Sequence, residues 1–349
     1  MLDLQLNAMK SVLLDIQDLK KNFYVQRGFL SGQQTVIKAV NGINLKIYRE
    51  ETLGLVGESG CGKSTLGRLI MRLEEPTEGK IFFEGEEILK YSGRVLKNYR
   101  KKVQIIFQDP YASLNPRRTA GGTIGEPFKI YEVSRGIEKE KRIAELMELV
   151  GLSKDQKDRY PHEFSGGQRQ RIGIARAIAL HPKLVIADEP VSALDVSIQA
   201  QILNLMRDLQ KQYGLTYLFI THDLSVVRHM SDRIAVMYLG KIVELAENNE
   251  LYSRPLHPYT MALLSAVPRP EPGKNKERII LDGDLPNPAN IPPGCAFHPR
   301  CPFRMEICDQ VEPELKDRGD AHLVSCHMEG CIVRCINYEG EFFKRDEIL

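Results

Sequence analysis

A glycine-rich segment between an apolar run and an expected helix constrains this chain more than any other feature. The segment Gly57–Thr65 (GESGCGKST) contains the pattern G-x-x-x-x-G-K-S/T, and Thr52–Val56 before it has the composition of a buried strand. Glycines let backbone N–H groups turn inward around phosphates, and a helix beginning near Gly62 adds the positive end of its dipole. The pattern predicts a strand, a phosphate-binding loop and a helix in this order.

Each part of the loop has an expected role in binding ATP. Lys63 can reach the β- and γ-phosphates, and the Ser64 hydroxyl can bind Mg²⁺. Cys61 is better explained as a tolerated small residue than as a regulator. The residues expected to contact the nucleotide are Gly57, Ser59, Gly60, Cys61, Gly62, Lys63, Ser64 and Thr65.

Short apolar runs alternate with amphipathic stretches through the first 240 residues, which predicts an α/β fold with a mostly parallel sheet covered by helices. Between Gln108 and Ser165 the strand pattern disappears, so we expect a helical insertion there. The predicted strands are Thr52–Val56, Val103–Phe107, Leu184–Ala187 and Tyr217–Ile220; the predicted helices are Ile137–Val150 and Ile198–Leu209.

Composition narrows the function classes. The 349 residues allow two domains, and the formal net charge of +2 gives no broad basic field that would suggest nucleic acid. Apolar runs are strand-sized and the N-terminus does not resemble a signal peptide. We therefore expect a soluble, cytosolic protein whose membrane role, if it has one, comes through a partner.

Two carboxylates follow the predicted strand in the segment LVIADE. Asp188 is expected to hold the Mg²⁺ shell, and Glu189 to polarise or orient the attacking water as general base. A pair of acids at a strand end is common on its own. Its position after a phosphate-binding loop favours ATP hydrolysis.

Further motifs give the chain a specific resemblance to the ABC ATPases. Ser165–Gln168 (SGGQ) resembles the family signature, Gln108 the Q-loop glutamine, Ser192–Asp195 (SALD) the D-loop, and His222 the switch histidine. The resemblance covers roughly residues 11–250. It implies a RecA-like parallel-sheet core with an antiparallel β subdomain and a helical subdomain at about 109–180.

The resemblance also implies roles for these residues. Gln108 joins Ser64 and Asp188 as a Mg²⁺ ligand and acts with Glu189 and His222 on the γ-phosphate and attacking water. Phe23 is placed where the family stacks an aromatic ring on adenine, with Tyr24 as a close rival. The residues expected to face the ATP of an opposing subunit, in a head-to-tail dimer, are Ser165, Gly166, Gly167, Gln168 and Asp195.

The segments QDPYASLNPR, YPHEFSGGQRQR, ADEPVSALDV and PLHPYTMALLSAVP resemble the ATPases of oligopeptide and dipeptide importers. This implies two transmembrane permease subunits as partners and a second, related but different ATPase chain. An external substrate-binding protein would be engaged only indirectly, and nucleic acid not at all. The protein would lie peripherally at the cytoplasmic face of the membrane.

Other functions stay open at this point. Nickel or another substrate of the same importer class is possible for the cargo. A non-transport ABC ATPase of DNA repair or translation would be expected to carry long coiled coils, a duplicated cassette or a basic arm, and the sequence has none. A decayed ATPase is disfavoured by intact Lys63, Asp188, Glu189 and His222.

Residues 251–349 form an expected C-terminal extension rich in proline and loops, which contains six of the seven cysteines. Intervals of five, six and seventeen residues separate the four chosen ligands, looser than common zinc sites. The importer resemblance implies a [4Fe–4S] cluster, with Zn²⁺ or unligated thiols as alternatives. The chosen ligands are Cys295, Cys301, Cys308 and Cys326, and either Cys331 or Cys335 could replace one of them.

Overall fold

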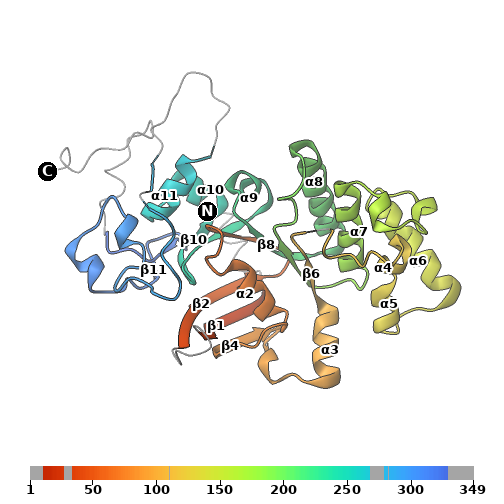
Figure 1. Ribbon diagram of the computed structural model, residues 1–349, viewed down its shortest axis with the longest axis horizontal. Coiled ribbons are helices and arrows are strands. Elements are labelled where there is room, and N and C mark those ends of the chain that lie inside the picture. The colour runs from red at the N-terminus through yellow and green to blue at the C-terminus, as the bar shows by residue number, and fades with distance from the viewer. Residues whose placement is uncertain (1–10, 27–33, 110, 268–278, 282, 329–349) are drawn as a thin grey trace, which may run out of the picture.

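A mixed eight-stranded sheet forms the centre of the computed structural model, which describes residues 11–26, 34–109, 111–267, 279–281 and 283–328 (Figure 1). The strand order is β11-β12-β10-β9-β3-β8-β7-β6. The parallel strands are β6 (Val103–Ile106), β7 (Leu184–Asp188), β8 (Thr216–Thr221), β3 (Thr52–Val56) and β9 (Arg233–Tyr238). The antiparallel edge is β10 (Lys241–Glu247), β12 (Leu323–Val324) and β11 (Lys316–Asp317).

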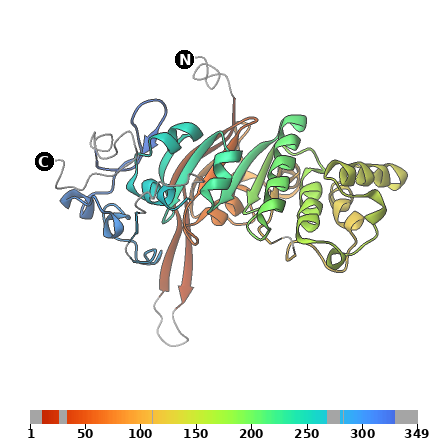
Figure 2. The ribbon, with the colours of Figure 1, turned by 90° about the horizontal axis from the view of Figure 1, so that it is seen from above.

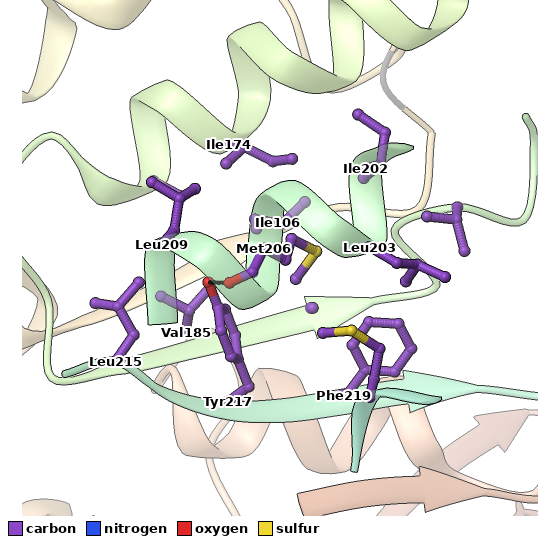
Figure 3. Close-up of a cluster of buried hydrophobic side chains, with 14 of the residues drawn as sticks. Ile106, Ile174, Val185, Ile202, Leu203, Met206, Leu209, Leu215, Tyr217 and Phe219 are labelled. Carbon is purple, nitrogen blue, oxygen red and sulfur yellow. Dashed lines mark hydrogen bonds between the residues drawn. The ribbon is translucent and has the colours of Figure 1, made fainter. Parts of the chain in front are cut away.

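The central strands are buried on both faces, which explains their continuous apolar sequences. Along β8, Tyr217 and Phe219 pack with helix α8 (Val196–Tyr213), whereas Leu218 and Ile220 pack with α2 (Lys63–Ile70) on the opposite face. Figure 3 shows the first of these clusters, where the Tyr217 hydroxyl donates a hydrogen bond to the Met206 carbonyl oxygen at 3.2 Å. The four predicted strands are confirmed.

A second, antiparallel sheet packs beside α2 in the order β2-β1-β4-β5. Its long strands β1 and β2 form a hairpin whose far end projects from the body of the molecule (Figure 2). Its elements and the helix that follows them are β1 (Val12–Gln26), β2 (Gln34–Tyr48), β4 (Glu78–Phe83), β5 (Glu86–Glu87) and α3 (Gly93–Lys102).

A group of helices separates β6 from β7 in sequence and extends to one side of the molecule, in yellow and green in Figure 1. The apolar residues Ile143 and Met147 of α6 are buried against this group. Both predicted amphipathic helices are present, as α6 and α8. The helices of this group are α4 (Ala120–Ile124), α5 (Glu126–Ile130), α6 (Gly136–Leu149) and α7 (Gly166–Ile178).

The C-terminal region is less independent than its proline content suggests. Helix α9 (Leu224–Met230) precedes β9, while α10 (Asn248–Ser253) crosses the boundary expected near residue 250. Helix α11 (Pro258–Ser265) follows, and β12, later in the chain, pairs with β10 of the main sheet. Apolar contacts and strand pairing therefore attach this region to the main sheet.

A buried polar network reinforces this attachment. The Glu244 carboxylate on β10 contacts the His322 imidazole Nε2 at 2.7 Å, and both side chains are fully buried. The same carboxylate accepts hydrogen bonds from the backbone N–H groups of Leu256 and His257. Every oxygen of this buried acid thus has partners from the C-terminal region, and leaving it unpaired would be costly.

The buried His257 should make stability depend on pH. Its Nδ1 accepts the backbone N–H of Tyr259 at 3.0 Å, and burial lowers the pKa of His257 to about 4 although the Glu244 carboxylate opposes this shift. An unfolded chain takes up this proton near pH 6.5, whereas the folded chain does not until about pH 4. Stability is therefore lost as the pH falls through this window.

We expect the change from pH 7 to pH 5 to cost about 2 kcal/mol through His257 alone. His257→Asn keeps an acceptor at the helix N-terminus, so it should remove this part of the pH dependence. Urea unfolding at both pH values measures the difference, with the exposed His229→Asn as control. Equal pH dependence in the wild type and in His257→Asn would contradict the assignment.

Candidate functional site

A cavity of about 590 Å³ opens where the loop between β3 and α2 meets the carboxyl ends of the neighbouring strands. All nine residues of Gly57–Thr65 line it. The other residues that line the cavity are Ile37, Lys38, Ala39, Gln108, Glu189, His222, Leu239, Gly240, Leu263 and Pro288.

Gly62 shows why the loop needs glycine. It has a φ of +108°, and a Cβ atom there would lie 2.1 Å from the Ala39 carbonyl oxygen. Only glycine combines this backbone conformation with such a close approach of β2. Cys61 beside it is buried, and burial raises the pKa of its thiol, as expected for a packing residue.

The ammonium group of Lys63 is turned toward the loop. Its Nζ donates to the carbonyl oxygens of Gly57 at 2.7 Å and Glu58 at 2.8 Å, and the residue is buried. The same three-donor group lies in the cavity wall, where a phosphate could take over one of these bonds. This geometry places a positive charge at the base of a site suited to a phosphate chain.

Oxygen atoms suitable for Mg²⁺ lie next to Lys63. The Ser64 hydroxyl donates to the Asp188 carboxylate at 2.9 Å, and burial raises the pKa of Asp188. Mg²⁺ prefers oxygen ligands and is commonly held by one or two protein groups together with substrate phosphates. A hydroxyl and a carboxylate in this arrangement fit that kind of site.

The Glu189 carboxylate contacts side chains that follow two other strands of the sheet. Its Oε2 accepts a hydrogen bond from the Gln108 amide at 2.8 Å, and its Oε1 lies 3.1 Å from the His222 Nδ1. The three residues follow β6, β7 and β8 respectively, although they are far apart in the sequence. A carboxylate held by an amide and an imidazole at the cavity wall is placed to act on a water molecule.

The signature segment lies away from this cavity. Ser165 begins α7 in a capping box, in which its hydroxyl accepts the Gln168 N–H at 3.3 Å while the Gln168 side chain accepts the Ser165 N–H at 3.0 Å. Ser165–Gln168 and the exposed Asp195 do not line the cavity of their own chain.

The structure does not bring the two candidate adenine-stacking residues to the cavity. Phe23 lies on β1 with Lys21 4.9 Å above its ring, and Tyr24 is 56% exposed. Neither lines the cavity, whose nearest wall is instead Ile37–Ala39 of the paired strand β2. No motif marks this wall, and the other residues that could not be predicted from the sequence are Leu239, Gly240, Leu263 and Pro288.

Comparisons with known proteins fit this geometry. A family model described as "ABC transporter" matches residues 40–192, and one described as "Oligopeptide/dipeptide transporter, C-terminal region" matches residues 243–308. The oligopeptide transport ATP-binding protein AppF of Bacillus subtilis is 54% identical over 92% of this chain and 98% of its own length. The dipeptide transport ATP-binding protein DppF of Escherichia coli is 50% identical over 91% of this chain and 95% of its own length.

The chain belongs to the ATP-binding proteins of oligopeptide and dipeptide ABC transporters. It is an ATPase of the ABC class, with ATP and accompanying Mg²⁺ as its cofactors.

Solved structures support the family assignment. A dimeric ATP-binding cassette in a post-hydrolysis state, bound to ADP and Pi, matches 68% of this chain and 99% of its own at 29% identity and a TM-score of 0.60. CbiO1 of Clostridium perfringens is described as part of an ABC transporter complex. Its structure covers 70% of this chain and 91% of its own chain, at 28% identity and a TM-score of 0.59. The P-loop ABC fold predicted from the sequence is therefore confirmed.

Four described cysteines of the C-terminal region lie near one another and form no disulfide, namely Cys295, Cys301, Cys308 and Cys326. Burial, with a smaller contribution from the neighbouring thiols Cys308 and Cys326, raises the pKa of Cys295 to about 11 and that of Cys301 to about 12. Burial also raises the pKa of Cys326. Cys331 and Cys335 lie outside the described residues.

Proximity alone does not make these cysteines a metal site. Within the described ranges, no group of three or more His, Cys, Asp or Glu side chains is placed to hold a metal ion. The structure and the comparisons therefore give no support to the predicted [4Fe–4S] cluster or to the Zn²⁺ alternative. The Ser64–Asp188 pair alone would hold Mg²⁺ only together with ligands from the nucleotide and water.

Replacing the carboxylate of Glu189 should separate ATP binding from ATP hydrolysis. Glu189→Gln keeps an oxygen that can accept from Gln108 but cannot take a proton from water, so we expect turnover to fall by roughly 10²–10⁴-fold. ATP binding should persist and the ATP-bound dimer should accumulate. Phosphate release and size-exclusion chromatography measure both effects, with the exposed Glu145→Gln on α6 as control. Continued steady hydrolysis in Glu189→Gln would refute its role as base.

Proposed function

We propose that this chain hydrolyses ATP to power the import of oligopeptides or dipeptides through a separate membrane permease. The match of residues 243–308 to the C-terminal region of oligopeptide and dipeptide transporters carries this proposal. Two relatives whose names specify oligopeptide or dipeptide transport align over most of the chain, which adds support. The cavity geometry supplies the ATPase half of the proposal.

The proposed catalytic arrangement follows from the contacts around Glu189. Glu189 acts as general base, His222 orients the carboxylate and the γ-phosphate, and Gln108 joins Ser64 and Asp188 around Mg²⁺. The hydrogen bonds Gln108–Glu189 and Ser64–Asp188 support this division of roles. Lys63 and the loop N–H groups neutralise the phosphates of ATP. Phe23 stays the proposed adenine-stacking residue, with Tyr24 as alternative.

A dimer completes each active site in this proposal. Ser165–Gln168 present the N-terminus of the thirteen-residue helix α7, a favourable position for an anion, yet they lie outside their own chain's cavity. We infer that they and Asp195 contact ATP held by an opposing, related but different ATPase chain. The dimeric cassette among the similar structures supports the arrangement.

Contact with the permease is assigned to the surface around Gln108–Asn115 and the helical group. These segments and the residue before them carry exposed apolar side chains, with Phe107 39%, Tyr111 58% and Ile130 48% exposed. No helix among the described residues combines the length and apolar character needed to cross a bilayer. We propose peripheral attachment at the cytoplasmic membrane face through two permease subunits, with no direct contact to the external binding protein or nucleic acid.

The domain division is also a proposal. Residues 11–250 form the nucleotide-binding domain, including a helical subdomain at about 109–180, and residues 251–349 form the importer-type extension. Helix α10 at the boundary contacts β9 and β10 on one side of the division, and its Glu250 lies 3.4 Å from the His322 Nδ1 on the other.

Transport in cells tests the cargo assignment. In a source strain lacking this chain, uptake of labelled dipeptides and oligopeptides should fall, and the wild-type gene should restore it while Glu189→Gln should not. Nickel uptake measured in parallel tests the alternative cargo. Restored nickel uptake without any effect on peptides would contradict the proposal, as would loss of DNA repair or translation with normal transport.

Ligation by Cys295, Cys301, Cys308 and Cys326 remains our proposal for the C-terminal region, with a [4Fe–4S] cluster preferred over Zn²⁺. The grounds for this proposal are the spacing of the four cysteines in the sequence and the resemblance of this region to importer ATPases. Anaerobically purified protein should contain about four iron atoms per chain. Cys301→Ser should lose iron and the control Cys61→Ser should retain it; colourless, iron-free protein would contradict the cluster.

A further inference from the structure

Glu58, the second residue of the phosphate-binding loop, is held through all of its polar groups. Its backbone N–H donates to the Tyr259 hydroxyl at 2.9 Å, and its carbonyl oxygen accepts from the Lys63 Nζ at 2.8 Å. Its carboxylate accepts two hydrogen bonds from one Arg300 nitrogen, at 2.9 and 3.2 Å. Two of these three partners belong to the C-terminal region rather than to the loop.

The Arg300–Glu58 pair is largely withdrawn from water. The Arg300 side chain is 8% exposed and that of Glu58 28% exposed. Screening by solvent is weak for such a pair, and an unpaired charge left in this position would be unfavourable. The pair should therefore persist through thermal fluctuations, unlike the exposed ion pair of Arg304 with Asp309 nearby.

Aromatic packing fixes the two partners of Glu58 relative to each other. Phe297, at the start of the turn that carries Arg300, packs edge-on against Tyr238 of β9 at 5.3 Å and lies 5.5 Å from the Tyr259 ring on α11. Tyr238 and Tyr259 are 4.8 Å apart. All three rings are buried, so Arg300 and the Tyr259 hydroxyl approach Glu58 from a rigid base.

We propose that Arg300 and Tyr259 are positioning residues of the ATP site, which hold the phosphate-binding loop in its binding conformation by fixing Glu58 through its side chain and backbone. The C-terminal region thereby sets the affinity for ATP, although it contributes none of the nucleotide-binding motifs. Leu263 and Pro288 from the same region line the cavity, and the Pro288 carbonyl oxygen accepts the Lys38 N–H at 3.4 Å. The inference concerns nucleotide binding and is independent of the cargo.

The mechanism is preorganisation. Inward-facing loop N–H groups bind phosphate best when they need not be reordered on binding, and ordering costs free energy that reduces affinity. Glu58 also supplies one of the two carbonyl oxygens that orient Lys63, so movement of Glu58 would disturb that ammonium. Loss of either partner should weaken ATP binding, while leaving Glu189 and its partners in place.

Arg300→Gln tests the side-chain contact in the full-length protein. We expect the Kd and KM for Mg·ATP to rise about tenfold, a size typical of coupling between sites, with a much smaller change in kcat at saturating ATP. Arg304→Gln removes an exposed arginine from the same segment and should leave both constants unchanged. Thermal unfolding without nucleotide identifies any variant that fails to fold.

A double-mutant cycle separates positioning from general destabilisation. If Arg300 acts through Glu58, Glu58→Gln should weaken binding similarly, and the variant with both changes should be no weaker than either single one. Tyr259→Phe removes only the hydroxyl that accepts from the Glu58 N–H and should raise the Kd severalfold while keeping the aromatic packing. Unchanged Kd in folded Arg300→Gln, or additive losses in the cycle, would overturn the proposal.

Discussion

Parallel pairing of four strands is the constraint on which the candidate site depends. Strands β6, β7, β8 and β3 run in the same direction, with Ile106 opposite Ala187, Asp188 opposite Ile220 and Val56 opposite Thr221. Their carboxyl ends consequently lie at one edge of the sheet, where segments from four distant places in the sequence are side by side. The Gln108–Glu189–His222 cluster and the Ser64–Asp188 pair require this register, because a slip by one residue would turn each side chain to the opposite face.

Sequence reasoning succeeded where a local physical rule was sufficient. Strands buried on both faces must be apolar throughout, and so Leu184–Asp188 and Thr216–Thr221 could be recognised without knowledge of their neighbours. The phosphate-binding loop was likewise recognisable, since its glycines are required by backbone geometry such as that of Gly62. Residues at the ends of such segments could then be assigned to one site, because parallel strands share an edge.

The walls of the cavity could not be predicted in this way. Ile37–Ala39, Leu263 and Pro288 have ordinary side chains, and only tertiary packing brings them to the loop. The attachment of the C-terminal region to the main sheet could not be predicted for the same reason: β12 has two residues, too few for a periodic pattern, and the partner of the buried His322 lies on β10. Short strands and buried polar pairs are stabilised by distant contacts, which no local sequence window contains.

The arrangement around Glu58 shows that the cassette and its C-terminal region form one physical unit at the nucleotide. Strand β9 carries Tyr238 in the aromatic cluster, and the turn after it, at Gly240, donates a backbone hydrogen bond to Cys61 of the loop. The same cluster supports the turn that presents Arg300. A displacement of the turn His298–Arg300 would therefore move Glu58 directly. The cluster of Gln108, Glu189 and His222, which follows β6, β7 and β8, would be little affected. Nucleotide affinity and the chemical step are thus held by different parts of the fold, and they can respond separately to changes in the C-terminal region.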